Sequence, residues 1–139
     1  MTGKSEMTQD HPNVGVLRTI YADLTRLGDY AADDIVLHTA NREVMPESGK
    51  IYGKEAAVAK ERQLVAATGN TLVMDVQEII ANDYFGAVTG VLRAHRNAKE
   101  LAMPFCGLWR FCDGRIVEHW ENAYNLAGLD EFHAPANTQ

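Results

Sequence analysis

Two side chains that can transfer protons near neutral pH, His119 and Glu121, lie two residues apart in the aromatic-rich stretch of residues 105–122 (FCGLWRFCDGRIVEHWEN). Residues two apart on a β-strand point to the same face of the sheet, so both side chains would enter one environment. A carboxyl group among apolar side chains loses hydration, which raises its pKa toward the range of a general acid or base. A histidine titrates near neutral pH and can relay the same proton. The spacing therefore predicts a proton-transfer site.

The element that would position these residues is a β-hairpin. Asp113-Gly114 stands between two runs rich in aromatic and β-branched residues, which is typical of a hairpin turn. We expect a three-residue turn at residues 112–114 that pairs Phe111 with Arg115. The pairs beyond it would be Trp109 with Val117, Gly107 with His119 and Phe105 with Glu121. A two-residue turn that pairs Cys112 with Arg115 would instead place Trp109 on the face opposite to the two titratable residues.

The expected register assigns every side chain of the hairpin to a face. One face would carry Phe105, Gly107, Trp109, Phe111, Val117, His119 and Glu121. The other would carry Cys106, Leu108, Arg110, Ile116, Glu118 and Trp120. Because Leu108, Ile116 and Trp120 would form an exposed apolar patch on this second face, we expect a homodimer through it.

The remaining elements follow from hydrophobic periodicity. Residues 1–12 are polar and predict a loose tail, and residues 13–133 predict a single domain. Helices are expected at residues 13–27 and 54–68, and a single helical turn at residues 126–132. Strands are expected at residues 35–39, 73–80, 84–96, 99–111 and 115–123. Residues 29–34 are either a short helix or a turn, and residues 40–52 a polar loop. Helices followed by hairpins indicate an α+β fold with an antiparallel sheet.

Composition excludes several classes of protein. Of 139 residues, 46% are hydrophobic and 23% charged, as in an ordinary globular domain, and the formal net charge of −6 argues against a nucleic-acid surface. No apolar run approaches the roughly 18 residues of a membrane span, and residues 1–13 contain no apolar segment typical of a signal peptide. Cys106 and Cys112 are too far apart along one strand to bond each other, which favours reduced thiols in a cytoplasmic protein.

The segment WRFCDGRIVEHWEN resembles the last hairpin of SnoaL-like proteins in the NTF2-like superfamily, which includes polyketide cyclases, ketosteroid isomerases and limonene epoxide hydrolases. The resemblance covers roughly residues 13–132. It implies a cone-shaped fold, in which a strongly curved antiparallel sheet wraps around N-terminal helices and encloses a pocket. In SnoaL-like cyclases the acidic residue just after the tryptophan is the catalytic acid/base, and Glu121 occupies that place.

The resemblance adds two further candidates. A histidine at the position of His38, after an Asp-Asp pair, is common in SnoaL-like proteins and often points toward the pocket; alternatively it is a strand-end cap. Ketosteroid isomerases place an oxyanion-hole tyrosine on the first helix, where Tyr21 lies; alternatively Tyr21 is a buried tyrosine with one polar partner. Glu121 and His119 also have ordinary alternatives, a solvated strand-end carboxylate and a half-exposed sheet histidine.

The sequence departs from its relatives at three places. Epoxide hydrolases carry an Arg-x-Asp pair on a middle strand, where this chain has Val88-Thr89-Gly90. The position that holds a protonated Asp in ketosteroid isomerases, and a nearby histidine in SnoaL-type cyclases, is Gly107. The ketosteroid base falls near Thr39, which cannot take a proton from carbon. These specific reactions are therefore not predicted, and Gly107 is expected to enlarge the pocket.

Metal and anion sites are not expected. The five histidines show no H-x-x-x-H or HExxH spacing, and the two cysteines lack zinc-site spacing. His95 and Arg93 lie near the expected turn at residues 96–97, where solvated charge is usual.

Two functional hypotheses remain. The first is cofactor-free acid–base chemistry of the isomerase or cyclase type on a small apolar carbonyl compound, with Glu121, His119 and His38 as catalytic residues. Its substrate-binding residues would be Tyr21, Phe105, Gly107, Trp109 and Phe111. The second is a non-catalytic ligand-binding or protein-interaction module on the same scaffold, because fold alone does not decide function.

Overall fold

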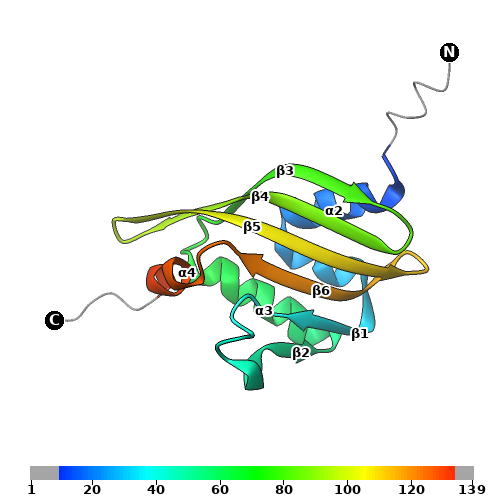
Figure 1. Ribbon diagram of the computed structural model, residues 1–139, viewed down its shortest axis with the longest axis horizontal. Helices are drawn as coiled ribbons and strands as arrows, with labels where there is room; N and C mark the ends of the chain where they lie inside the picture. Colours follow the sequence, from blue (N-terminus) through cyan, green and yellow to red (C-terminus); the bar gives the residue numbers. More distant parts are fainter. Residues whose placement is uncertain (1–9, 134–139) are drawn as a thin grey trace, which may run out of the picture.

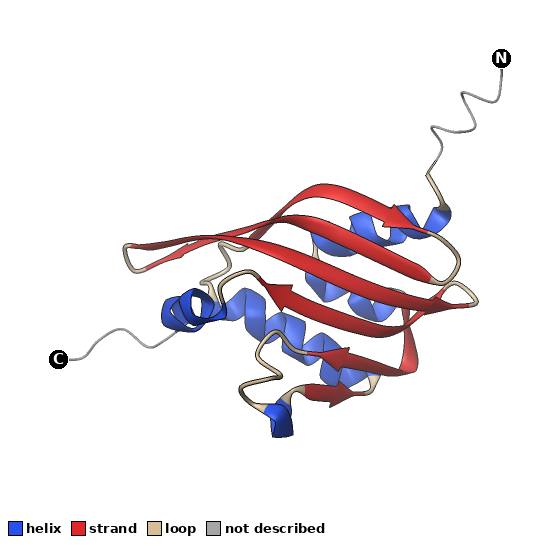
Figure 2. Cartoon of the chain, in the orientation of Figure 1, coloured by secondary structure: helices blue, strands red, loops and turns tan. Residues whose placement is uncertain are grey.

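The computed structural model describes residues 10–133 and shows one curved sheet with helices packed on one of its faces (Figures 1 and 2). The predicted α+β class is confirmed. In chain order the elements are α2 (Pro12–Ala22), the 3₁₀ helix η1 (Leu24–Asp29), β1 (Ala31–His38), the 3₁₀ helix η2 (Pro46–Ser48), β2 (Lys50–Tyr52), α3 (Lys54–Ala67), β3 (Val73–Ala81), β4 (Phe85–Arg96), β5 (Lys99–Cys112), β6 (Arg115–Ala123) and α4 (Leu126–His133).

The sheet has six strands in the order β2-β1-β6-β5-β4-β3. Every neighbouring pair is antiparallel except β1 and β6, which run parallel because β1 comes from the helical half of the chain and joins the edge of the hairpin array. The prediction of a purely antiparallel sheet was wrong for this one pair. Helix α2 packs against β3 and β4, and α3 packs against β1, so both helices cover the same face (Figure 1).

The first helix is shorter than expected. It ends at Ala22 because Asp23 is extended and its carboxylate accepts hydrogen bonds from the backbone and hydroxyl groups of Thr25. These bonds cap the separate turn η1, which still buries Leu24 and Leu27 along the stripe that the periodicity predicted. Strand β1 then begins at Ala31, so neither a second helix nor a simple turn fills residues 29–34. The expected polar loop of residues 40–52 contains η2 and the short strand β2.

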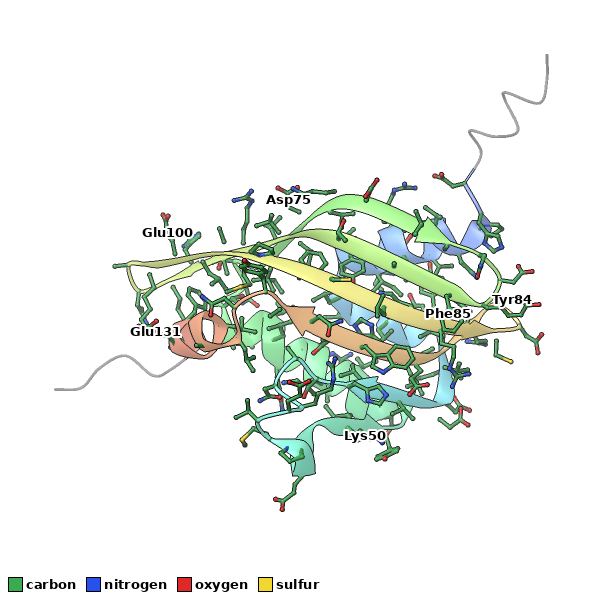
Figure 3. The ribbon with its side chains drawn as sticks, viewed as in Figure 1. Lys50, Asp75, Tyr84, Phe85, Glu100 and Glu131 are labelled. Carbon is green, nitrogen blue, oxygen red and sulfur yellow. The ribbon has the colours of Figure 1, made fainter. Side chains whose placement is uncertain are left out.

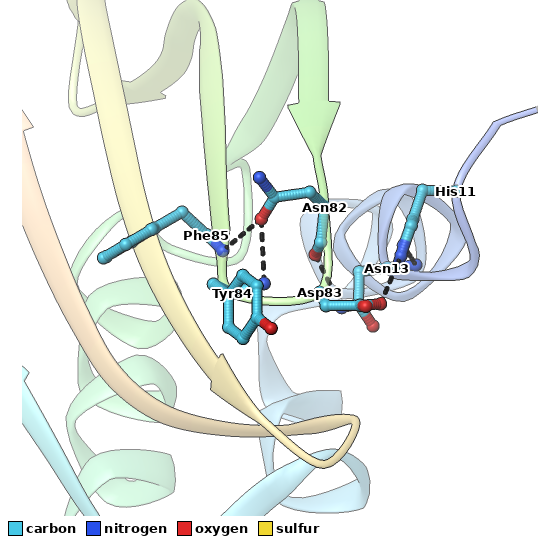
Figure 4. A network of polar contacts seen from close by, with 6 residues as sticks. All are labelled: His11, Asn13, Asn82, Asp83, Tyr84 and Phe85. Carbon is cyan, nitrogen blue, oxygen red and sulfur yellow. Dashed lines mark hydrogen bonds and ion pairs between the residues drawn. The ribbon is translucent and has the colours of Figure 1, made fainter.

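Polar contacts fasten the start of α2 to the turn between β3 and β4 (Figure 4). The Asn13 side-chain amide donates to the Asn82 carbonyl at 3.0 Å, and His11 Nε2 lies 2.8 Å from an Asp83 carboxylate oxygen. The Asn82 side chain in turn accepts bonds from the backbone N–H groups of Tyr84 and Phe85, both at 2.8 Å. The helix is therefore held across the sheet at the end opposite to α4 (Figure 1).

The hairpin of β5 and β6 has a different register from the predicted one. Asp113 and Gly114 have φ values of 51° and 81°, which form a two-residue turn and pair Cys112 with Arg115. A β-bulge follows, because Phe111 pairs with Ile116 and Arg110 with Glu118, which leaves Val117 as an extra residue.

The bulge restores the shared face that the two-residue turn alone would have destroyed. Trp109 lies opposite His119 and Gly107 opposite Glu121. The predicted pairs were wrong, but the inner face still carries Gly107, Trp109, His119 and Glu121. The exception is Ile116, which was expected on the outer face and is fully buried. Between the turn and the bulge, the alternation of inward and outward side chains on β6 is shifted by one residue from the predicted register.

The core lies between this inner face and the helices. Its fully buried members include Leu17, Ile20, Leu27, Ile35, Leu37, Val88, Trp109 and Ile116. Among residues 10–133, no helix is both long and apolar enough to cross a membrane. The predicted tail, residues 1–12, lies mostly outside the described residues.

Candidate functional site

A cavity of about 140 Å³ lies between the inner face of the sheet and the helices. Its walls come from α2, η1, the loop after β1, α3, the middle strands, β6 and α4. Apolar side chains form most of the wall: Leu24, Leu64, Met74, Leu92, Met103, Phe105, Trp109, Leu126 and Leu129. The polar and titratable groups are Tyr21, Thr39, Asn41, Lys60, Glu61, Cys106, His119, Glu121 and Asn122. Such a mixture is typical of small-molecule sites.

Glu121 is placed in the cavity by β6. The residue is partly accessible through the cavity, but the surrounding protein removes most of its hydration. This desolvation raises the pKa of the Glu121 carboxyl to about 7, although Lys60, the backbone amide of Ala40 and Arg42 act to lower it. The Arg42 guanidinium is already bound to the Glu121 backbone carbonyl at 2.6 Å and to the Asn122 side chain at 2.8 Å. In the described part of the chain the Glu121 carboxyl forms no salt bridge, so it can exchange its proton near neutral pH.

His119 stands beside it on the same strand face and is only 3% exposed. Its Nδ1 lies 2.9 Å from the Leu108 carbonyl oxygen, which can only accept, so Nδ1 carries the proton and Nε2 is left as an acceptor. Burial lowers the pKa of His119 to about 3, against the opposing effect of this hydrogen bond. The ring stacks on Trp109 with 3.4 Å between the centroids. His119 is therefore a fixed, neutral imidazole.

Tyr21 enters from α2 and meets the sheet at Trp109. The Trp109 indole N–H donates to the Tyr21 hydroxyl oxygen at 3.2 Å, and the Tyr21 ring stacks on Phe105 at 5.5 Å. Burial raises the pKa of Tyr21 well above its ordinary value, so the phenol stays protonated. Because the hydroxyl accepts the bond from Trp109, its own proton is available as a donor.

Gly107 lines the cavity but does not enlarge it as expected. A Cβ built at Gly107 would overlap the Tyr21 hydroxyl and come within 3.1 Å of the Trp109 indole nitrogen. The space that the missing side chain leaves is filled by these two groups. The glycine is therefore what allows the hydroxyl of α2 to reach the strand.

The site contains one titratable residue that the sequence analysis missed, Glu61 of α3. It is 1% exposed, and its Oε1 has no hydrogen-bond partner among the residues that the structure describes. Desolvation and the nearby Glu121 raise its pKa well above the ordinary value. The ligand atoms of Glu61, His119 and Glu121 lie within 4.8 Å of one another, a spacing that could hold a metal ion or a proton.

A signal for Glu61 exists in the sequence. Ala57, Val58 and Leu64 recur at helical spacing around it, so Glu61 falls on the buried stripe of its helix. A carboxyl group on such a stripe is unusual. The neighbouring charged residues Lys60 and Arg62 hid the pattern, because the run KER has the composition of a solvated surface.

Two of the predicted site residues lie elsewhere. His38 does not line the cavity, because the parallel register pairs it with Trp120 and puts it on the opposite sheet face from His119. There it stacks on Trp120, and its Nε2 lies 2.6 Å from a Glu118 carboxylate oxygen. Phe111 also lies outside the cavity wall; it is buried in the core near Gly86, beyond the bulge.

The arrangement combines three kinds of group around one space. Two carboxyls with raised pKa values can accept or donate protons, a neutral imidazole can accept a hydrogen bond, and a phenol can donate one to a substrate oxygen. These are the groups needed to move a proton next to a carbonyl.

Comparison with known proteins identifies relatives that cover most of the chain. A search of curated protein sequences finds no match. Among solved structures, Bal32a from a soil-derived mobile gene cassette is 25% identical, with a TM-score of 0.76 over 88% of this chain and 96% of Bal32a. The candidate polyketide cyclase IdmH from Streptomyces antibioticus is 22% identical, with a TM-score of 0.69 over 89% of this chain and all of IdmH.

TerC, co-crystallised with polyporic acid, is 13% identical, with a TM-score of 0.71 over 88% of this chain and 98% of TerC. Other neighbours are described as having NTF2-like and cystatin-like folds, which confirms the expected fold class. The SnoaL-like domain model matches residues 21–119. The resemblance of the last hairpin thus extends over most of the described chain, and the protein belongs to the SnoaL-like family.

Proposed function

We propose that this protein is an enzyme that performs cofactor-free acid–base chemistry, of the isomerase or cyclase type, on a small apolar carbonyl compound. The observation that carries the proposal is the Glu121 carboxyl, which faces a largely apolar cavity, has no salt-bridge partner among residues 10–133 and has a pKa of about 7. Such a group changes its protonation state at the pH of the cell, as a general acid or base must.

The other cavity groups support a substrate with one polar end. The Tyr21 hydroxyl can donate to a carbonyl oxygen, while Phe105, Trp109 and Met103 offer apolar surface to the rest of the molecule. A cavity of about 140 Å³ is close to the size that holds a single aromatic ring. We therefore propose a substrate of about that size, with an acidic C–H next to the carbonyl.

The proposal can be tested without knowing the natural substrate. Small cyclic ketones and β-diketones are incubated with the protein in D₂O, and exchange of the hydrogens next to the carbonyl is followed by NMR. Glu121→Gln should lower the exchange rate by about 100-fold or more. Glu55→Gln, which removes the same charge from an exposed position of α3, should leave it unchanged.

The stability of the variant separates a catalytic carboxyl from a structural one. A folded pKa above the unfolded value means that Glu121 costs stability as the pH rises above the unfolded pKa, and the cost is complete above about pH 7. Glu121→Gln should therefore be as stable as the parent at pH 8, or more stable. A clearly less stable variant, with exchange unaffected, would show that Glu121 is a structural residue.

The second candidate function, a non-catalytic interaction module, has one observation in its favour. A hollow of about 520 Å³ lies on the outer face of the sheet and is lined by apolar residues that include Ile80, Phe85, Leu108 and Trp120. Phe85 is 56% exposed and lies on the side of the sheet away from α2 and α3 (Figure 3). We propose that a second copy of the chain covers this face; a dimer is compatible with either function.

A further inference from the structure

We infer that Glu61 and Glu121 form a carboxyl pair that shares one proton, so that the cavity holds a general acid and a general base in a single protonation state. The existence of the pair rests on its geometry and on the charges around it. Its use in catalysis rests on the proposed function.

The geometry of the pair comes from two elements that are far apart in the sequence. Glu61 belongs to α3 and Glu121 to β6, and their carboxyl oxygens lie within 4.8 Å of each other. Glu61 is almost completely buried, and its Oε1 has no hydrogen-bond partner in the described part of the chain. An ionised carboxylate without a partner is costly at such a depth, whereas a protonated carboxyl carries no charge that needs one.

The charges around the pair favour a state in which one carboxyl is ionised and the other is protonated. The titratable and charged groups that face it are Tyr21 from α2, Arg42 from the loop after β1, Lys60 from α3, Cys106 from β5 and His119 from β6. Tyr21 and His119 are neutral, and Arg42 is committed to the Glu121 backbone carbonyl and the Asn122 side chain. Lys60 is then the one cation left among these groups, and it balances one carboxylate. The second carboxyl keeps its proton because two like charges this close cannot both ionise easily.

The shared proton suits the chemistry of a carbonyl compound. The ionised carboxylate removes a proton from the carbon next to the carbonyl, so a C–H bond breaks and its electron pair moves into a C=C bond. The protonated carboxyl gives its proton to the carbonyl oxygen, so an O–H bond forms. The product is an enol, and the pair again holds one proton, now on the other residue. If the substrate also has a C=C bond next to the carbon that lost its proton, the resulting dienol can be protonated at the far end of the conjugated system while its O–H proton returns to the carboxylate, which is an isomerisation. An enol that attacks a second carbonyl of the same molecule gives a cyclisation.

A proton suits this site better than a metal ion. The spacing of the three groups would admit a divalent cation, but Lys60 lines the same cavity and would repel it. Elemental analysis of the purified protein distinguishes a bound metal ion from a shared proton.

The experiment titrates both carboxyls by ¹³C NMR in protein labelled at the glutamate side-chain carbons. The parent should show two linked steps that are seen at both residues. In Glu61→Gln, Glu121 should titrate in a single step, and the upper of the two parent steps should be lost, because the second carboxyl of the pair is gone. Glu121→Gln should likewise leave Glu61 with a single step, and Glu55→Gln should change neither titration.

Three outcomes would overturn the inference. One is a Glu121 titration curve that is unchanged in Glu61→Gln, and a second is a Glu61 that is ionised throughout. The third is one equivalent of divalent metal, measured by elemental analysis of protein purified without chelator, that Glu61→Gln no longer binds. If Glu61→Gln does not fold, the reciprocal Glu121→Gln variant carries the test.

The titration tests the carboxyl pair and the hydrogen-exchange assay tests the proposed enzyme, so that either hypothesis can fail without the other. A shared proton without exchange activity would leave the pair intact and refute the proposed enzyme. Exchange activity that is lost in Glu121→Gln but unaffected in Glu61→Gln would leave the enzyme and refute the use of the pair in catalysis.

Discussion

At the scale of single residues, the site depends on groups whose charge differs from what their chemistry would give in water. His119 is the clearest case, because burial overrides its ordinary basicity and the Leu108 carbonyl fixes which nitrogen carries the proton. A neutral imidazole beside a carboxyl does not draw the proton away from it, so the proton stays available to the carboxyl groups.

This arrangement predicts a specific loss of stability in acid. The folded pKa of His119 is about 3 and the unfolded value about 6.5, so the unfolded chain binds a proton that the folded chain refuses. Above pH 6.5 the neutral His119 does not lower the free energy of unfolding. As the pH falls from 6.5 toward 3, protonation of His119 in the unfolded chain lowers this free energy by up to about 4 kcal/mol. His119→Asn, whose amide can still donate to Leu108, should lack this loss in urea unfolding at pH 7, 5 and 4.

The two cavity carboxyls act in the opposite direction, because their raised pKa values favour the folded state in acid. The comparison is therefore the difference between parent and variant at each pH. His95→Asn, at an exposed position of β4, serves as the control. Parallel pH profiles for the parent and His119→Asn would contradict a buried neutral histidine.

At the scale of elements, the bulge at Val117 decides which side chains reach the cavity. The turn Asp113-Gly114 sets the strand pairing at the tip of the hairpin, where Ile116 faces the core. The bulge shifts the pairing by one residue of β6, so that His119 and Glu121 face the same side farther along the strand. Bulges are common next to functional sites, where they redirect side chains.

Deleting Val117 should therefore leave the cavity residues in place. Without it, Ile116 would be followed by Glu118 in regular alternation, and Trp109 would still face His119. We expect a cost of about 1–2 kcal/mol for the lost twist, with near-UV circular dichroism of the buried Trp109 retained.

Deleting Trp120 is the matched control, because it moves Glu121 to the other face of β6. This deletion should abolish the α-hydrogen exchange of the parent. A Val117 deletion that behaves like the Trp120 deletion would show that the register beyond the bulge depends on Val117 itself.

How much of this could be predicted from the sequence differs between local and tertiary features. The Asp-Gly turn and the alternation along β6 are local, so the hairpin and the shared face of His119 and Glu121 followed from them. The bulge could not be read, because it depends on how β1 and β5 both pair with β6. His38 was placed wrongly for the same reason: its face is set by its parallel pairing with Trp120 of β6, which lies far away along the chain.

At the scale of the whole molecule, the two faces of the sheet do different things. The inner face closes over the cavity, while the outer face leaves Ile80, Phe85 and Leu108 largely accessible, at 67%, 56% and 41%. The outer patch differs from the predicted one, because Ile116 is buried and residues of β3 and β4 take its place.

Apolar residues gathered in this way predict a homodimer. Sedimentation at micromolar concentration should give twice the chain mass, and Leu108→Lys should give a monomer because it places a charge in the interface. Val44→Lys, an exposed change in the loop between β1 and β2, should leave the dimer intact. A parent that sediments as a monomer would rule out this use of the outer face.

The two tryptophans of the chain each lie flat against a histidine, on opposite faces of the sheet. Trp109 stacks on His119 beside the cavity, and Trp120 stacks on His38 on the outer face. An excited indole passes an electron readily to a protonated imidazole, so a histidine in contact with it controls the brightness of its fluorescence. Because His119 stays neutral at ordinary pH, the emission of Trp109 should respond to what enters the cavity, whereas that of Trp120 should respond to what covers the outer face. With phenylalanine in place of one tryptophan, the protein becomes its own optical probe for the other face.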